Sequence, residues 1–163
     1  YPKAGVSDLN GQLMAPIELG KSEVLLESSK SKILILAIGT MSWEAFKAAK
    51  ELEKENIYCT VVNLRFAKPL DIDCLEKHIN LNDQVIIIEE GVQIGGVGSY
   101  IIQSFRHLNK PVNTFHQMAI QDEFVDHGKI PTLLKEHHLT KEDIISKVKT
   151  ILKSTNSITT SNF

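Results

Sequence analysis

The sequence predicts an α/β domain of three layers, in which helices cover both faces of a mostly parallel sheet of about five strands. Short apolar runs alternate with segments of helical periodicity along most of the 163 residues, as expected when crossover helices join parallel strands. The apolar runs are nearly continuous, which is typical of strands buried on both faces. A short polar joint between the first two runs adds one antiparallel strand, which we place at an edge of the sheet.

The chain divides into three parts. Residues 1–19 are rich in Gly, Pro and polar residues without a clear period, so we expect a linker or arm from a preceding domain. Residues 20–153 form the folded domain, and residues 154–163 are expected to be a disordered polar tail. Since the chain starts at Tyr1 without a leader-like segment, we expect a processed or excised piece of a larger protein.

The domain begins with two strand-like runs, at 23–28 and 32–38, whose polar joint predicts a hairpin. A helix follows over 41–57, because apolar residues recur there at near-helical spacing. The later elements are strands at 59–66, 84–90 and 111–118 and helices at 71–80 and 100–108.

A final helix is expected after a capping signal. Thr140 is followed three residues later by Asp143, which takes the place of the usual Glu or Gln of a capping box. The apolar face of this helix consists of Ile144, Ile145, Val148, Ile151 and Leu152.

Composition argues against several kinds of partner. A net charge of −2 gives no electrostatic reason to expect nucleic acid. No apolar run approaches the roughly 20 residues that a membrane span needs, so no membrane partner is expected. The two cysteines, Cys59 and Cys74, form no CxxC pair and are expected to be buried, reduced thiols.

The most prominent candidate site is a glycine-rich turn between a strand and a helix. Helix-start amides in such a turn can bind phosphate, but this spacing is neither the dinucleotide fingerprint nor a P-loop. The acidic residues just before it would repel an anion. We therefore favour close packing of the helix start against a strand or a second subunit, and leave phosphate binding open. The glycines are Gly91, Gly95, Gly96 and Gly98.

Glu89 and Glu90 lie at the carboxyl end of a predicted parallel strand, where such folds place functional groups. Acid–base catalysis would need a partner group, and the spacing offers none. We expect one of the two carboxylates to hydrogen-bond loop amides or to meet a neighbouring domain.

Other polar residues have structural explanations. None of the six histidines shows a recognised zinc spacing, and we favour a structural role for His127 beside Asp126. Arg65 and Asp71 flank a strand end, where an ion pair and a helix N-cap account for them without a ligand. From the residues alone, we predict no catalytic or metal-binding residue.

Five segments in order resemble the C-terminal domain of the 1-deoxy-D-xylulose-5-phosphate synthases, which are transketolase-like enzymes. The similarity extends over about residues 1–153, and five ordered motifs are far more specific than any one of them. The segments are Tyr1-Pro2-Lys3, Gly39-Thr40-Met41, and residues 63–71 (NLRFAKPLD), 89–99 (EEGVQIGGVGS) and 122–128 (DEFVDHG).

The resemblance implies a parent transferase that uses thiamine diphosphate and Mg²⁺. That enzyme condenses pyruvate with glyceraldehyde 3-phosphate, releases CO₂, and supplies isoprenoid precursors by the non-mevalonate route. The resemblance also implies that missing N-terminal and middle domains hold the cofactor, that this piece supports a homodimer, and that it is inactive alone. The family occurs in bacterial cytoplasm and in plastid-type organelles.

One residue is implied to touch substrate. The family has Arg after Tyr-Pro, near the phosphate of the aldehyde, and this sequence has Lys3 there. Lysine keeps the positive charge but lacks the bidentate fork of arginine. An exposed linker lysine is the alternative for Lys3.

Two other readings of the whole chain stay open. The β subunits of 2-oxoacid dehydrogenases share the domain fold and a similar acidic, glycine-rich segment, but Tyr-Pro-Lys and residues 65–71 favour the synthase. A free-standing α/β module that binds a nucleotide or a protein is the alternative from a different class.

Overall fold

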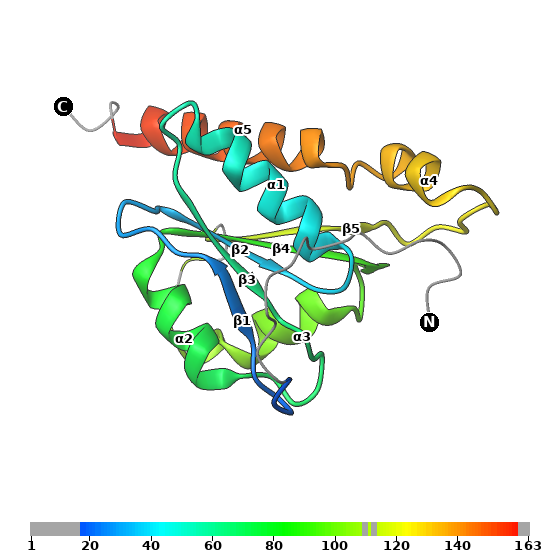
Figure 1. Cartoon of the computed structure of the whole chain (residues 1–163), viewed down its shortest axis with the longest axis horizontal. Coiled ribbons are helices and arrows are strands. Elements are labelled where there is room, and N and C mark those ends of the chain that lie inside the picture. Colours follow the sequence, from blue (N-terminus) through cyan, green and yellow to red (C-terminus); the bar gives the residue numbers. More distant parts are fainter. Residues whose placement is uncertain (1–16, 109–110, 112–113, 160–163) are drawn as a thin grey trace.

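The computed structural model describes residues 17–108, 111 and 114–159, with side chains described as far as residue 155. Strands and helices alternate as the hydrophobic pattern predicts, and a short helix before the last one, α4, was not predicted (Figure 1). The elements are β1 (Glu23–Leu26), β2 (Ile33–Ala37), α1 (Met41–Glu53), β3 (Cys59–Asn63), α2 (Ile72–Leu81), β4 (Gln84–Val92), α3 (Val97–Ser104), a 3-10 turn η1 (Arg106–Leu108), β5 (Phe115–Ile120), α4 (Ile130–Glu136) and α5 (Lys141–Thr159).

The sheet has five strands in the order β1-β3-β2-β4-β5. β2, β3, β4 and β5 are parallel, whereas β1 runs antiparallel to β3 at one edge. In the centre, Ile35 of β2 pairs with Val61 on one side and Ile86 on the other. The predicted mixed sheet with an antiparallel edge strand is therefore confirmed.

The predicted hairpin between the first two strands is wrong, because β3 lies between β1 and β2. The connection that follows β1 is fastened to other elements instead. Ser31 Oγ accepts a 2.9 Å hydrogen bond from the Thr60 N–H at the start of β3 and lies 2.8 Å from Asn82 Oδ1 after α2. A polar joint indicates where the chain reverses, but it does not determine which strand becomes the neighbour.

Helices cover both faces of the sheet, as the three-layer prediction requires (Figure 1). α1 and α5 pack on one face, where Ala45, Leu52, Ile144 and Val148 are fully buried. α2 and α3 pack on the other, around Phe105. Both faces of the central strands are thus removed from water, which explains why the strand sequences are continuously apolar.

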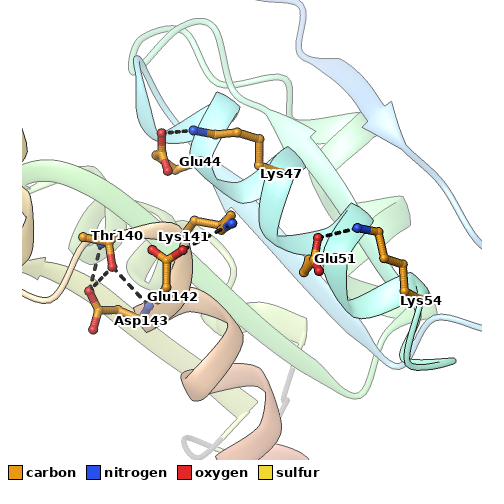
Figure 2. Close-up of polar contacts among 8 residues, drawn as sticks. All are labelled: Glu44, Lys47, Glu51, Lys54, Thr140, Lys141, Glu142 and Asp143. Atoms are coloured by element: carbon orange, nitrogen blue, oxygen red, sulfur yellow. Dashed lines mark hydrogen bonds and ion pairs between the residues drawn. The ribbon is translucent and has the colours of Figure 1, made fainter.

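The outer surface of α1 carries ion pairs between residues three positions apart, about one turn of helix. Lys47 contacts Glu44, and Lys54 contacts Glu51 at 2.7 Å (Figure 2). The hydrogen bond and charge of Lys54 lower the pKa of the Glu51 carboxyl, with a further contribution from Lys141 at the start of α5. Exposed pairs of this kind stabilise a helix only slightly.

The predicted capping signal is present at the start of α5 (Figure 2). The Asp143 Oδ2 atom accepts a 3.0 Å hydrogen bond from the Thr140 N–H, and Thr140 Oγ1 accepts one of 3.3 Å from the Asp143 N–H. This reciprocal pair satisfies helix-start amides as a capping box does. α5 extends to Thr159, so the helix continues into the segment expected to be a tail; the domain limits themselves stay a prediction.

Candidate functional site at the carboxyl end of the sheet

Glu89 lies near the carboxyl end of β4 and is 4% exposed. Its Oε2 atom accepts a 2.9 Å hydrogen bond from the Val97 N–H, and its Oε1 atom accepts one of 2.7 Å from the Gly98 N–H. These are the first two amides of α3, whose N-cap residue Gly96 has no side chain to offer. The carboxylate of Glu89 therefore closes this helix end from a neighbouring strand, where the helix dipole also favours negative charge.

The glycines of the turn are required by this arrangement. A Cβ atom at Gly96 would lie 2.1 Å from the Val92 carbonyl oxygen, and one at Gly91 would lie 2.7 Å from Glu89 Oε2. Gly95 has a φ of 78°, which favours glycine for a different reason. The turn is thus shaped to bring its backbone close to the buried carboxylate.

The same geometry bears on phosphate binding. An anion at the start of α3 would have to displace Glu89 from Val97 and Gly98 or lie against its negative charge. The geometry therefore favours the packing interpretation of the turn over a phosphate site. Glu90 is exposed, and its Oε2 atom faces Gly39 after β2, 3.9 Å from the position of a Cβ there.

Gly98 brings α3 against β5. A Cβ at Gly98 would lie 2.5 Å from Gln117 Nε2. The Gln117 amide lies within 3.4 Å of Ser99 Oγ, which in turn donates a 2.7 Å hydrogen bond to the Gln93 carbonyl. A polar network therefore ties the glycine-rich turn, α3 and β5 together.

Arg65 and Asp71 both hold the start of β1, but with different partners. Arg65 pairs with Glu23 at 2.9 Å. Asp71 lies at the N-cap of α2, accepts a 3.0 Å hydrogen bond from the Ser22 N–H, and pairs with Lys21 at 3.6 Å. The two residues thus anchor the chain where it enters the sheet, and the structure does not bring them to the glycine-rich turn.

The histidines form no metal site in the part of the chain that the structure describes. His127 is exposed in the segment between β5 and α4. Burial, followed by the charge of Lys77, lowers the pKa of His78. Burial, followed by the charge of Lys147, lowers the pKa of His116.

Both cysteines are free thiols, as predicted, although Cys74 is only half-buried. Burial raises the pKa of Cys59 to about 12. Burial, and then the charge of Asp71, raises the pKa of Cys74 as well. Neither environment produces a reactive thiolate near neutral pH.

Sequence reasoning missed two features. The first is a groove of about 530 Å³ between β5, the end of α4 and α5. The second is Phe124, which is fully exposed beyond β5. The groove depends on the position of α4, whose short sequence has a proline at its start and too few residues for a helical period to be recognised.

Lys3 lies outside the described residues, so its proposed contact with substrate stays a prediction. Among residues 17–108, 111 and 114–159, no helix is long and apolar enough to cross a membrane.

The fold and the carboxyl end of β4 together define an α/β domain in which the buried carboxylate of Glu89 is hydrogen-bonded at the glycine-rich turn. Residues 20–144 match the family model described as the transketolase C-terminal domain. The chain belongs to the transketolase C-terminal domain family.

Curated relatives with similar sequences are named 1-deoxy-D-xylulose-5-phosphate synthase. The protein from Alkaliphilus oremlandii is 33% identical over 91% of this chain, and the one from Bacillus licheniformis is 39% identical over 82% of it. The chain spans about a quarter of the length of the first of these and 21% of the second.

Solved structures share the fold. A split-gene transketolase, described as an inactive β4 tetramer, superposes with a TM-score of 0.76 at 29% identity, over 91% of this chain and 46% of that one. A transketolase from Pichia stipitis superposes with a TM-score of 0.59 at 22% identity, over 84% of this chain and 19% of that one. The second likeness concerns the fold alone.

Proposed function

We propose that this chain is the C-terminal domain of a 1-deoxy-D-xylulose-5-phosphate synthase. In this proposal the parent enzyme condenses pyruvate with glyceraldehyde 3-phosphate and releases CO₂ on the way to isoprenoid precursors. The observation that carries the proposal is 33% identity over 91% of the chain to a relative of that name. The ordered motifs from Tyr1 to Gly128 support it. The compartment would be bacterial cytoplasm or a plastid-type organelle, as in the family.

The described residues do not fit thiamine diphosphate or Mg²⁺. They hold no group of three His, Cys, Asp or Glu residues that could bind a metal ion. The amides at the start of α3, which could bind a diphosphate, are already hydrogen-bonded to Glu89. In this proposal the cofactor therefore belongs to the missing domains, and the role of this domain is structural.

Partner domains follow from the length of the relatives. The chain spans 24% of the synthase from Alkaliphilus oremlandii, which leaves room for the N-terminal and middle domains. The likeness to a protein described as a split-gene transketolase supports partner domains on a separate chain as the alternative. We propose that the carboxyl edge of the sheet, with Glu90 and the exposed side chains of Val92 and Ile94, meets these domains in a homodimeric parent.

A transketolase is the second candidate for the parent, because the split-gene transketolase is 29% identical over 91% of this chain. The substrates distinguish the two. Full-length parent protein, with thiamine diphosphate and Mg²⁺, should release CO₂ from pyruvate only when glyceraldehyde 3-phosphate is present. Transfer of a two-carbon unit from a ketose phosphate, without CO₂ release, would replace the synthase proposal with a transketolase.

The role of Lys3 has a separate test in the same full-length protein. Lys3→Ala should raise KM for the phosphorylated aldehyde more than KM for pyruvate, because in this proposal it removes the positive charge that pairs with the phosphate. Lys3→Arg is the matched control, and it should preserve or lower the aldehyde KM. Equal effects of Lys3→Ala on both substrates would remove the assigned role and leave the synthase proposal intact.

A further inference from the structure

Two aromatic side chains of α1 stack on each other at the border of the domain. The rings of Trp43 and Phe46 have centroids 5.4 Å apart and planes inclined by 13°. Both residues are partly exposed, and among the described residues neither contributes to the two apolar clusters that form the core. A stacked aromatic pair in this position is an apolar surface on which another segment can pack.

The pair belongs to the flank of α1 that faces the β1 edge of the sheet. Residues that recur at intervals of three or four form one stripe along this helix, namely Ser42, Phe46, Ala49 and Glu53. At one end of the stripe, Ser42 Oγ donates a 3.0 Å hydrogen bond to Asn63 Oδ1 of β3. At the other end, Ala49 borders a hollow of about 170 Å³ together with Leu26 of β1. We call this stripe, together with Trp43, the β1-side flank of α1.

α5 packs against the opposite flank of α1. Glu51 is turned by about 200° around the helix from Ala49, because each residue adds about 100°. Lys54 lowers the pKa of the Glu51 carboxyl, and Lys141 at the start of α5 adds to this effect. The β1-side flank is therefore turned away from α5, toward the edge strand of the sheet.

The chain enters the sheet beside this flank. Glu23, the first residue of β1, pairs with Asn63 at the end of β3. The side chain of Asn63 in turn accepts the hydrogen bond from Ser42, the residue before Trp43. The segment that leads into β1 therefore approaches the sheet at the same end as the first turn of α1.

We propose that residues 9–16 pack along the β1-side flank of α1 and cover the pair formed by Trp43 and Phe46. The side chains that make this contact are Leu9, Leu13 and Met14. Eight extended residues span roughly 26 Å, whereas the 13 residues of α1 are about 20 Å long. The segment can therefore follow the whole flank. The inference concerns the chain before Ile17 and does not depend on the proposed reaction.

This segment suits the flank in composition as well as in length. Residues 9–16 contain no charged side chain, and three of the eight are large and apolar. Burying them against an aromatic pair removes apolar surface of both partners from water. Because the segment is joined to β1 close by, its effective concentration at the flank is high, and a modest contact is enough to hold it there.

The fluorescence of Trp43 tests the proposal directly, because the chain contains one tryptophan. Replacing Leu9, Leu13 and Met14 together by Ser in the full chain should shift the emission of Trp43 to longer wavelength. Quenching of the emission by acrylamide should increase in the same variant, since the ring becomes accessible to water. Unchanged emission and unchanged quenching would overturn the proposal.

The matched control replaces three apolar side chains that are exposed elsewhere. Leu81, Phe124 and Ile130 changed together to Ser should leave the emission of Trp43 as it is. An equal shift in the control would overturn the proposal. Quenching of the unaltered chain that decreases with protein concentration would also overturn it, because a second copy would then cover the pair.

The partner side of the contact has its own test. Phe46→Ala should speed chymotryptic cleavage within residues 9–14, because the segment loses part of the surface that holds it. Phe124→Ala removes a fully exposed ring beyond β5 and should leave that rate unchanged. An unchanged rate in Phe46→Ala, or the same increase in Phe124→Ala, would contradict packing of the segment on α1.

Discussion

The Oε1 atom of Glu89 accepts a 2.7 Å hydrogen bond from the Gly98 N–H, so a strand carboxylate caps a helix nine residues further along the chain. In the sequence, an acidic residue at a strand end next to glycines is also typical of a catalytic or phosphate-binding site. Burial at 4% exposure and two helix-start amides give it a structural role instead.

Glu89→Gln should lower the free energy of unfolding by about 1–3 kcal/mol. The side-chain NH₂ group of glutamine would face a backbone N–H that needs an acceptor, and the negative charge at the helix start would be lost. Urea unfolding of the chain measures this value. Glu90→Gln removes the same charge from the adjacent exposed residue and should have little effect. Equal losses in the two variants would show that net charge, rather than the cap, is responsible.

Gly96→Ala should destabilise the domain by about 1–3 kcal/mol through overpacking, because the new methyl group would lie 2.1 Å from the Val92 carbonyl oxygen. Thermal and urea unfolding both report this loss. Gly128→Ala is a suitable comparison, since its methyl group would meet only the movable Leu133 side chain at 3.2 Å. A fully stable Gly96→Ala variant would mean that the turn relaxes without cost.

Thr140→Ala should lower the free energy of unfolding by about 1 kcal/mol, because it removes the hydroxyl that caps α5. The core-facing residues of α5 are unchanged in this variant. Lys54→Ala, which breaks an exposed ion pair on α1, should leave the unfolding midpoint unchanged within error. The contrast is measurable by urea unfolding at constant pH. A loss of stability in Lys54→Ala without a loss in Thr140→Ala would contradict this ranking.

Stability should fall as the solution becomes more acidic than the usual histidine pKa. Burial lowers the pKa of His78 below its ordinary 6.5, so the unfolded chain binds the proton first as pH falls. His78→Gln should reduce the loss of unfolding free energy between about pH 7.5 and about pH 5. His127→Gln, at an exposed position, should leave that pH dependence as it is. His116 acts in the same direction and accounts for part of the remaining slope.

The parts of the fold that rest on local chemistry could be predicted from the sequence. Continuous apolar runs indicated the buried strands, and Thr140 with Asp143 indicated the start of α5. Asp71 was placed correctly at the N-cap of α2. Each of these signals lies within a few residues of the structure it determines.

The parts that depend on distant contacts could not be predicted. Nothing in the joint after β1 indicates that β3 would insert beside it, and the partner of Arg65 turned out to be Glu23 rather than a neighbour in sequence. For Glu89, the sequence limited the choices to loop amides or a neighbouring domain, and the fold identified the amides as those of Val97 and Gly98. Strand order and side-chain pairing are set by the whole core.

The position of β1 has a mechanical consequence. This strand is the first that a pull on the amino side of the domain would reach, and β3 is its one neighbour in the sheet. Its other attachments include the ion pairs of Lys21 with Asp71 and of Glu23 with Arg65 and the hydrogen bond from the Ser22 N–H to Asp71. The four parallel strands stay paired to one another without it. Under tension, the domain would therefore lengthen by releasing β1 while the rest of the sheet remained folded.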